Sequence, residues 1–338
     1  MAASFLPLVD ICDNFKLACH RADLVSFYLT ADLCPAVGLL WPEVVQALQD
    51  DNKFAVKEGR TPSWVFVPQA YGHAFRGVHF AQHLSTPIAR SVAIAATCTH
   101  WRDTGLFASI IGGHMWRNEL YPVYSDPFKS QTPENIEFEV ERAASSLFGI
   151  VTYGVHMTVY RPPIAGSNEE TMIWVPTRSK TKQTWPGHLD NTVAGGIPAG
   201  MFPFEALVKE SIEEASLAEE IVRAHTRCIG AISYFFEKNG RWLQPEIEYT
   251  YELKIPPTTT SGELESFCPK PLDGEVESFE LLPLSEVISR LHKKLFKPNC
   301  AVVLIDFLIH HGYITPENEP NFLEIVTRLH GRFGFEQW

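Results

Sequence analysis

Three glutamates lie close together in the segment EALVKESIEEASL, residues 205–217. Glu210, Glu213 and Glu214 are three and four positions apart, so on a helix they share one arc of about a third of a turn. Like charges at this spacing repel each other unless a cation lies between them. A divalent metal ion would supply that cation, although a solvated acidic helix face has the same pattern.

The elements that would position these glutamates are a helix and the loop before it. The pattern predicts a helix over about 203–216, beginning with Pro203, because a first-turn proline loses no hydrogen bond. The loop VAGGIPAG, residues 193–200, can bring bare backbone close to a ligand or a metal. Four apolar residues are expected on the opposite side of the helix, against the core: Phe204, Val208, Ile212 and Ala215.

The loop and the helix together resemble the Nudix box, the signature of enzymes that cleave a diphosphate linked to another group. In this resemblance Gly195 opens the loop, and Lys209 followed by the three glutamates lies at the family's spacing. The chain departs from the pattern at three positions. Met201 replaces an acidic residue, Lys209 replaces an arginine and Ser216 replaces a glycine. The resemblance therefore implies a box that has lost a structural ion pair and kept its carboxylates.

The resemblance implies a cofactor, Mg²⁺ or Mn²⁺. Such hard cations prefer oxygen ligands and keep several waters, so a few carboxylates and the substrate's phosphate oxygens complete the shell. The family implies Glu210 and Glu214 as principal ligands, Glu213 as an assisting one and the carbonyl of Ala194 as a backbone ligand. It also implies a catalytic carboxylate from a distant loop, for which Glu275 is the candidate and Glu277 the alternative. An ordinary exposed turn explains that loop equally well, and the identity of the general base stays open.

A basic run precedes the glycine loop in TRSKTKQTWPGHLDNTVAGG, residues 177–196. Arg178, Lys180 and Lys182 bring positive charge to the place where a diphosphate would need it. Trp185 adds an aromatic face that could stack on a ring. These four residues are the predicted substrate-binding set, and an exposed basic hairpin tip is the alternative.

Two further stretches, WRNELYPVY (116–124) and DGEVESFELLPL (273–284), extend the resemblance over nearly the whole chain. They resemble the two-domain Nudix hydrolases of fungi and plants, whose relatives include fusions to thiamine pyrophosphokinase. That subgroup implies removal of one phosphate from the diphosphates of damaged thiamine, such as the oxo and oxy forms. The alternatives are a Nudix diphosphatase for a nucleotide-type substrate and a non-catalytic ligand-binding regulator.

Two side-chain groups have open roles at this stage. Glu246 and Glu248 alternate with Ile247 on a probable strand, so both share one face. They could contact the organic half of a ligand, but water is slightly favoured. Arg117, with its neighbours in WRNELYPVY, either closes the site from the first domain or, as the favoured role, holds the two domains together.

Composition restricts the partners. The 338 residues carry a formal net charge of −12, which argues against nucleic acid as a partner because phosphate binding needs clustered cations. The seven cysteines form no CxxC pair and are odd in number, which favours a reducing compartment. With no signal sequence and no apolar run long enough to span a membrane, we expect a cytoplasmic protein without membrane contact, monomeric or homodimeric. The expected partner is a small-molecule diphosphate.

The fold expected is α/β: a Nudix α/β/α sandwich with a mixed sheet over 145–338, preceded by a small α+β domain over 1–144. In the first domain a helix begins at Pro42 and SWVFVPQAY, 63–71, is strand-like. In the second, strands are predicted at about 148–161, 171–177, 191–194, 226–237, 246–255 and 277–282, and helices at about 203–216, 284–293 and 298–312.

Overall fold

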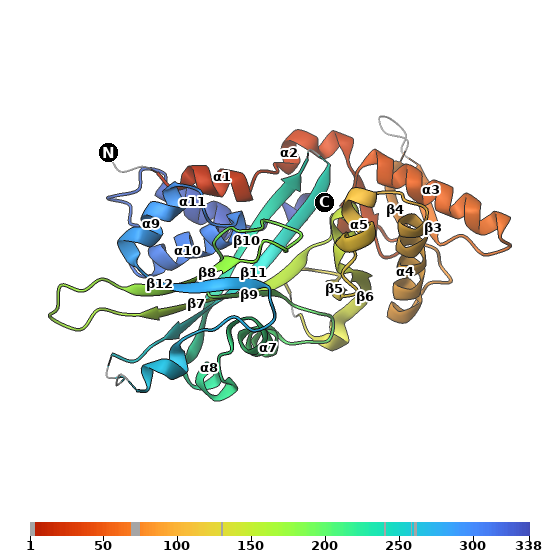
Figure 1. The fold of residues 1–338 in the computed structure, drawn as a ribbon. Coiled ribbons are helices and arrows are strands. Elements are labelled where there is room, and N and C mark those ends of the chain that lie inside the picture. Colours follow the sequence, from red (N-terminus) through yellow and green to blue (C-terminus); the bar gives the residue numbers. More distant parts are fainter. Residues whose placement is uncertain (1–3, 69–74, 130, 240, 258, 260–261) are drawn as a thin grey trace.

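The structure, a computed structural model, describes residues 4–68, 75–129, 131–239, 241–257, 259 and 262–338. Within these ranges no helix is both long and apolar enough to cross a membrane. The chain forms a mixed β-sheet between two helical layers, and a smaller α+β unit adjoins one end of that sheet (Figure 1).

In the described residues the large sheet has the strand order β10-β11-β7-β8-β12, and β9 pairs with β7. The β11 and β7 strands are parallel, whereas the other pairs are antiparallel, so the sheet is mixed as expected. The strands are β7 (Thr152–Arg161), β8 (Met172–Arg178), β9 (Val193–Gly196), β10 (Thr226–Lys238), β11 (Trp242–Lys254) and β12 (Val276–Pro283).

Helices cover both faces of this sheet, and each layer has its own core. One core joins α7 (Pro203–Ala215) and α8 (Glu219–His225) to the sheet through residues such as Leu207 and Val222. The other core lies beneath α9 (Leu284–His292), α10 (Pro298–His310) and α11 (Phe322–Leu329). The predicted α/β/α sandwich is therefore confirmed. The apolar helix expected at 298–312 is α10, and it is buried almost all round because it lies in the centre of its layer.

The first part of the chain is the predicted small α+β unit. A four-stranded sheet of order β2-β1-β4-β3 packs with helices and with the β5–β6 hairpin around a third core. Its strands are β1 (Val25–Tyr28), β2 (Ala36–Leu40), β3 (Trp64–Pro68), β4 (Phe75–Phe80), β5 (Leu120–Tyr124) and β6 (Ile136–Glu141). Its helices are α2 (Leu17–His20), α3 (Pro42–Lys57), α4 (Pro87–Asp103), α5 (Ala108–Ile111) and α6 (Ser145–Phe148). Short 3-10 helices occupy 21–23, 113–115, 133–135, 142–144, 264–267 and 335–337.

Two expected strands, one in each part of the chain, differ in detail from the structure. The strand-like segment 63–71 contains β3, and its last three residues lie outside the described residues. The strand expected from 148 begins at Thr152 instead, because Phe148 ends the α6 turn and Gly149 adopts a left-handed conformation there.

The N-terminal helix α1 (Leu6–Cys12) packs on the second part of the chain and not on the first. Leu8 and Val9 belong to the core beneath α10 and α11, and Arg328 binds Asp13 at 2.8 Å. The division at 144/145 therefore does not separate two independent packing units, because the chain begins inside the sandwich before it forms the α+β unit.

Candidate functional site

The glycine loop and the acidic helix meet at Gly195 and Glu210. Gly195 lies on β9, which pairs with β7 and packs against the second half of α7. A Cβ atom built on Gly195 would lie 2.3 Å from Cγ and 2.4 Å from Cδ of Glu210. No side chain fits in that space, so a glycine is required for the strand to approach the carboxylate this closely.

Glu214 lies one turn further along the same side of α7 and is buried. Its Oε2 accepts a hydrogen bond of 3.3 Å from the backbone N–H of Ala194. Burial, together with the negative charges of Glu210 and Asp190, raises the pKa of Glu214 to about 8. Burial also raises the pKa of Glu210. Two carboxylates are thus held near one strand in surroundings that oppose their charge, which is what a bound cation would relieve.

The third glutamate of the cluster shares Lys209 with Glu210 and lies at the surface. Glu213 is exposed, and its Oε2 lies 2.9 Å from Nζ of Lys209, which is also 3.3 Å from Glu210. The expected apolar stripe is wrong in one place: Ile212 is 38% exposed, while Ser211 and Glu214 occupy the buried face. Glu213 as a metal ligand stays a prediction, and its ion pair with Lys209 would have to break.

The residues present fit a hard divalent cation with few protein ligands. No cluster of three or more His, Cys, Asp or Glu side chains suited to a metal ion occurs in the described ranges. Mg²⁺ needs only one or two carboxylates when waters and phosphate oxygens complete its shell. Burial and the nearby carboxylates raise the pKa of Glu214 by disfavouring its charged form, a cost that such an ion would relieve.

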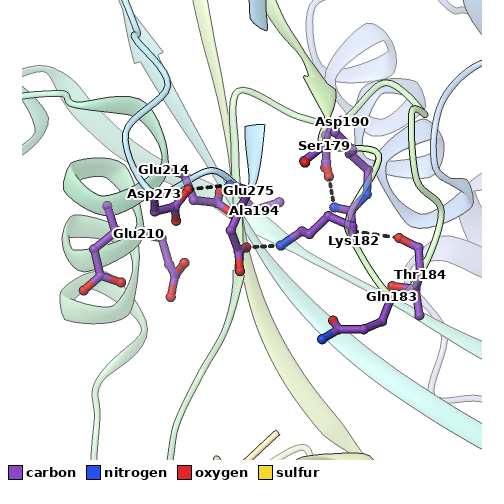
Figure 2. Close-up of polar contacts among 12 residues, drawn as sticks. Ser179, Lys182, Gln183, Thr184, Asp190, Ala194, Glu210, Glu214, Asp273 and Glu275 are labelled. Atoms are coloured by element: carbon purple, nitrogen blue, oxygen red, sulfur yellow. Dashed lines mark hydrogen bonds and ion pairs between the residues drawn. The ribbon is translucent and has the colours of Figure 1, made fainter. Parts of the chain in front are cut away.

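Lys182 and Glu275 lie opposite these glutamates and form an ion pair, drawn in Figure 2. The backbone N–H of Glu275 donates to Asp273 at 2.8 Å, which fixes the turn before β12. Burial lowers the pKa of Lys182 to about 8, and the charge of Glu214 opposes this shift. The predicted loop carboxylate and one predicted lysine are therefore brought together beside Glu214.

The other predicted substrate-binding cations have different surroundings. Arg178 is buried and binds Asp190 at 2.5 Å, and it also donates to the backbone carbonyls of Thr184 and Trp185. Its guanidinium thus holds the loop over 184–190 in shape. Lys180 is 81% exposed, 3.6 Å from the alternative acid Glu277. These two cations are not brought together with the glutamates of α7.

A cavity of about 770 Å³ adjoins the glycine loop, a volume that suits a small organic ligand. Trp185 is the member of the predicted substrate-binding set that lines it. Residues from both parts of the chain form its wall, among them Arg117, Tyr121, Arg142, His156, Gln183, Thr184, Trp185, Ala194, Gly195, Gly196, Tyr234, Glu246, Glu248, Lys297 and Asn299.

Glu246 and Glu248 lie in this cavity, so the slightly favoured expectation that they face water is wrong. Tyr234 donates its hydroxyl to Glu248 at 2.8 Å and also contacts Glu246. Nε2 of His156 lies 3.5 Å from Glu248, and its other ring nitrogen is 2.7 Å from Oδ1 of Asn191. Burial raises the pKa of Glu248, but His156, the hydrogen bond from Tyr234 and the charge of Lys297 together outweigh it and lower that pKa to about 2.

Sequence reasoning found the shared face of these two carboxylates but not what covers it. The signal for the shared face was the alternation of Glu246, Ile247 and Glu248 along the strand. His156 and Tyr234 gave none, because neither lies in a recognisable motif. Their proximity depends on β7, β10 and β11 being neighbours in the sheet, which single-strand patterns do not determine.

Comparisons with known proteins agree with this arrangement of elements. The family model "NUDIX domain" matches residues 160–301, and "Domain of unknown function (DUF4743)" matches residues 5–152. A Saccharomyces cerevisiae protein, "Uncharacterized protein YJR142W", is 44% identical over 69% of this chain and 66% of its own length. From Arabidopsis thaliana, "Nudix hydrolase 20, chloroplastic" is 38% identical over 74% of this chain and 60% of its own length.

A third relative, "Nudix hydrolase 24, chloroplastic" of Arabidopsis thaliana, is 34% identical. The match covers 92% of this chain and 79% of that protein, whereas the chain spans slightly less than two thirds of the two relatives above. The similarity therefore extends over both the α+β unit and the sandwich that carries Gly195, Glu210 and Glu214. The chain belongs to the Nudix hydrolase family.

Proposed function

We propose that the chain is a divalent-metal-dependent diphosphatase. The observation that carries this proposal is the close approach of Gly195 to Glu210 and the hydrogen bond from Ala194 to the buried Glu214, beside a cavity of about 770 Å³. Glu210, Glu214 and the carbonyl of Ala194 would hold Mg²⁺ or Mn²⁺. The ion would neutralise phosphate charge and make a bound water more acidic.

In the reaction, a water oxygen forms a bond to the terminal phosphorus and the bridging P–O bond breaks, which gives a monophosphate and inorganic phosphate. We assign Glu275 to take the proton of the attacking water. Lys182 holds its carboxylate beside Glu214, on the side of the site away from α7. Glu213 is retained as an assisting residue that would act only after leaving Lys209.

The proposed substrates are the diphosphates of thiamine-like compounds, with oxo- and oxythiamine diphosphate preferred over thiamine diphosphate. A cavity wall that carries Glu246 and Glu248 suits a ring with positive charge or N–H donors, and Trp185 offers a stacking surface. Removal of such damaged coenzyme is the role that this substrate class supports. We place the protein in a reducing compartment such as the cytosol, in keeping with its seven free cysteines.

The test measures hydrolysis with and without Mg²⁺, as inorganic phosphate released from oxythiamine diphosphate and thiamine diphosphate and as AMP released from ADP-ribose. The expected result is Mg²⁺-dependent release that is fastest with oxythiamine diphosphate and is lost in Glu214→Gln. Glu220→Gln, an exposed acid on the next helix, is the matched control. Full Mg²⁺-dependent activity in Glu214→Gln would refute the site, and a preference for ADP-ribose would refute the substrate class.

A further inference from the structure

The α+β unit contributes an arginine pair to the cavity wall beside the glycine loop. Arg117 lies just before β5, and Arg142 follows β6, so the β5–β6 hairpin brings them together. Burial and the neighbouring charge of Arg142 lower the pKa of Arg117. Two guanidinium groups that repel each other in an acidic chain indicate a place where an anion belongs.

The two arginines differ in how far they are already neutralised. Arg142 binds Glu119 at 2.8 Å and lies over the ring of Tyr121, 5.3 Å from its centroid. The guanidinium of Arg117 donates to the neutral side-chain oxygen of Gln183 and forms no ion pair within the described part of the chain. Its backbone N–H, which donates to Glu141 at 2.8 Å, fixes its position. Arg117 thus has a held backbone and a guanidinium without an ion pair, on which the charges of Glu119 and Glu141 act only by partly opposing the lowered pKa.

Two other cations near the glycine loop are already neutralised by carboxylates. Arg178 binds Asp190, and Lys182 binds Glu275. Lys297 lines the cavity near carboxylates, where it opposes the effect of burial on the pKa of both Asp190 and Glu246. Arg117 therefore differs from Arg142, Arg178 and Lys182 in having no carboxylate within ion-pair distance among the described residues.

The position of Arg117 relative to the glycine loop is held by direct contacts between the two parts. The backbone N–H of Ala199 donates to the carbonyl of Leu120 at 2.9 Å. A Cβ on Gly196 would lie 1.8 Å from the hydroxyl oxygen of Tyr121, so strand β5 presses on the loop itself. Gln183 reaches back to the carbonyl of His114 at 3.3 Å. The hairpin that carries Arg117 therefore cannot shift without moving the loop.

We propose that Arg117 binds the phosphate groups of the substrate, so that the active site is shared between the α+β unit and the Nudix domain. This inference rests on the proposed function for its substrate class. A planar guanidinium gives two parallel hydrogen bonds to a phosphate. To do so Arg117 exchanges the amide oxygen of Gln183 for phosphate oxygens, in a cavity that Ala194 and Gly195 of the glycine loop also line.

The experiment uses the full chain and inorganic pyrophosphate as the probe, measured by calorimetry with Mg²⁺, together with the KM for oxythiamine diphosphate. Arg117→Met is expected to raise both the Kd and the KM about tenfold, the size of one lost charge-assisted hydrogen bond. Arg117→Lys keeps the positive charge but loses the planar guanidinium, so its Kd and KM should lie between those of the original chain and those of Arg117→Met. Arg76→Met, an exposed arginine of the same unit, is the matched control and should change neither constant.

The outcomes separate this inference from the proposed function. Normal hydrolysis and normal pyrophosphate binding in Arg117→Met would overturn the inference alone. Pyrophosphate binding that depends on Arg117, in a protein that hydrolyses none of the substrates, would overturn the function and keep the phosphate site. If Arg117→Met does not fold, Arg117→Lys decides, because a constant within twofold of the original chain contradicts a bidentate contact.

Discussion

The side chain of Glu210 occupies the space that any side chain at residue 195 would need. Gly195→Ala must therefore push Glu210 away from β9, because the nearest atoms are its Cγ and Cδ and not its flexible end. A catalytic group displaced by about 1 Å costs on the order of a hundredfold in rate. We expect that loss in Mg²⁺-dependent turnover, with unchanged circular dichroism. Gly262→Ala, where a Cβ meets nothing within 4 Å, is the control, and equal turnover in both variants would contradict the assignment.

The metal-free protein should lose stability as the pH rises, because of Glu214. Its folded-state pKa is about 8, above the ordinary 4.5, so the folded state binds more protons than the unfolded state between these values. The free energy of unfolding should fall from pH 4.5 to pH 8, by on the order of a few kcal/mol at about 1.4 kcal/mol per pKa unit. Glu214→Gln should reduce this fall, measured by urea unfolding in EDTA at pH 5, 6.5 and 8. An identical pH dependence in both proteins would show that Glu214 is not the responsible group.

Lys182 should affect metal binding more than Lys180, although both lie in the same loop. Lys182→Met removes a positive charge that opposes the raised pKa of Glu214, so a proton competes more strongly with Mg²⁺ for that carboxylate. We expect the Mg²⁺ concentration for half-maximal rate to rise several-fold, up to about tenfold for one pKa unit. The rise should be larger at pH 6.5 than at pH 8.5. Lys180 is 81% exposed, so Lys180→Met should leave the Mg²⁺ concentration for half-maximal rate unchanged. Equal effects of the two variants would contradict a role of Lys182 in metal binding.

The helix α1 should stabilise the sandwich on which it packs. Val9 is fully buried in the core beneath α10 and α11. Val9→Ala should lower the free energy of unfolding by about 2 kcal/mol, from lost apolar burial and the cavity left behind. Val92→Ala, at a position 64% exposed on α4, should change it by less than about 0.5 kcal/mol. Urea denaturation measures both, and similar losses would mean that α1 adds little to the core.

The sandwich could be predicted from the sequence because its signals are local. The alternation of β7 and β11 and the proline start of α7 lie in continuous segments, and the structure has these elements within a few residues of the expected bounds. What could not be predicted depends on contacts between distant segments. Arg178 was expected to meet phosphate, but its buried partner Asp190 becomes a neighbour only when the loop folds back.

The same reason explains the incomplete view of the candidate site. The spacing of Glu210 and Glu214 on one helix indicated their shared side, but spacing alone did not show that Glu213 turns to Lys209. The sequence indicated that Glu246 and Glu248 share one face. It did not indicate that Tyr234 and His156 contact Glu248, because these two residues come from other strands. The role of Arg117 needed the packing of the α+β unit against the loop, which no single segment encodes.

Because Tyr121 of the α+β unit packs over Gly196 of the glycine loop, we expect these two positions to change together in evolution. A methyl group at residue 196 would collide with the phenol ring of Tyr121, so such a change requires a smaller side chain at residue 121. A chimera that joins the α+β unit of a distant relative to this Nudix domain should therefore fail to fold correctly unless residues 121 and 196 come from the same protein.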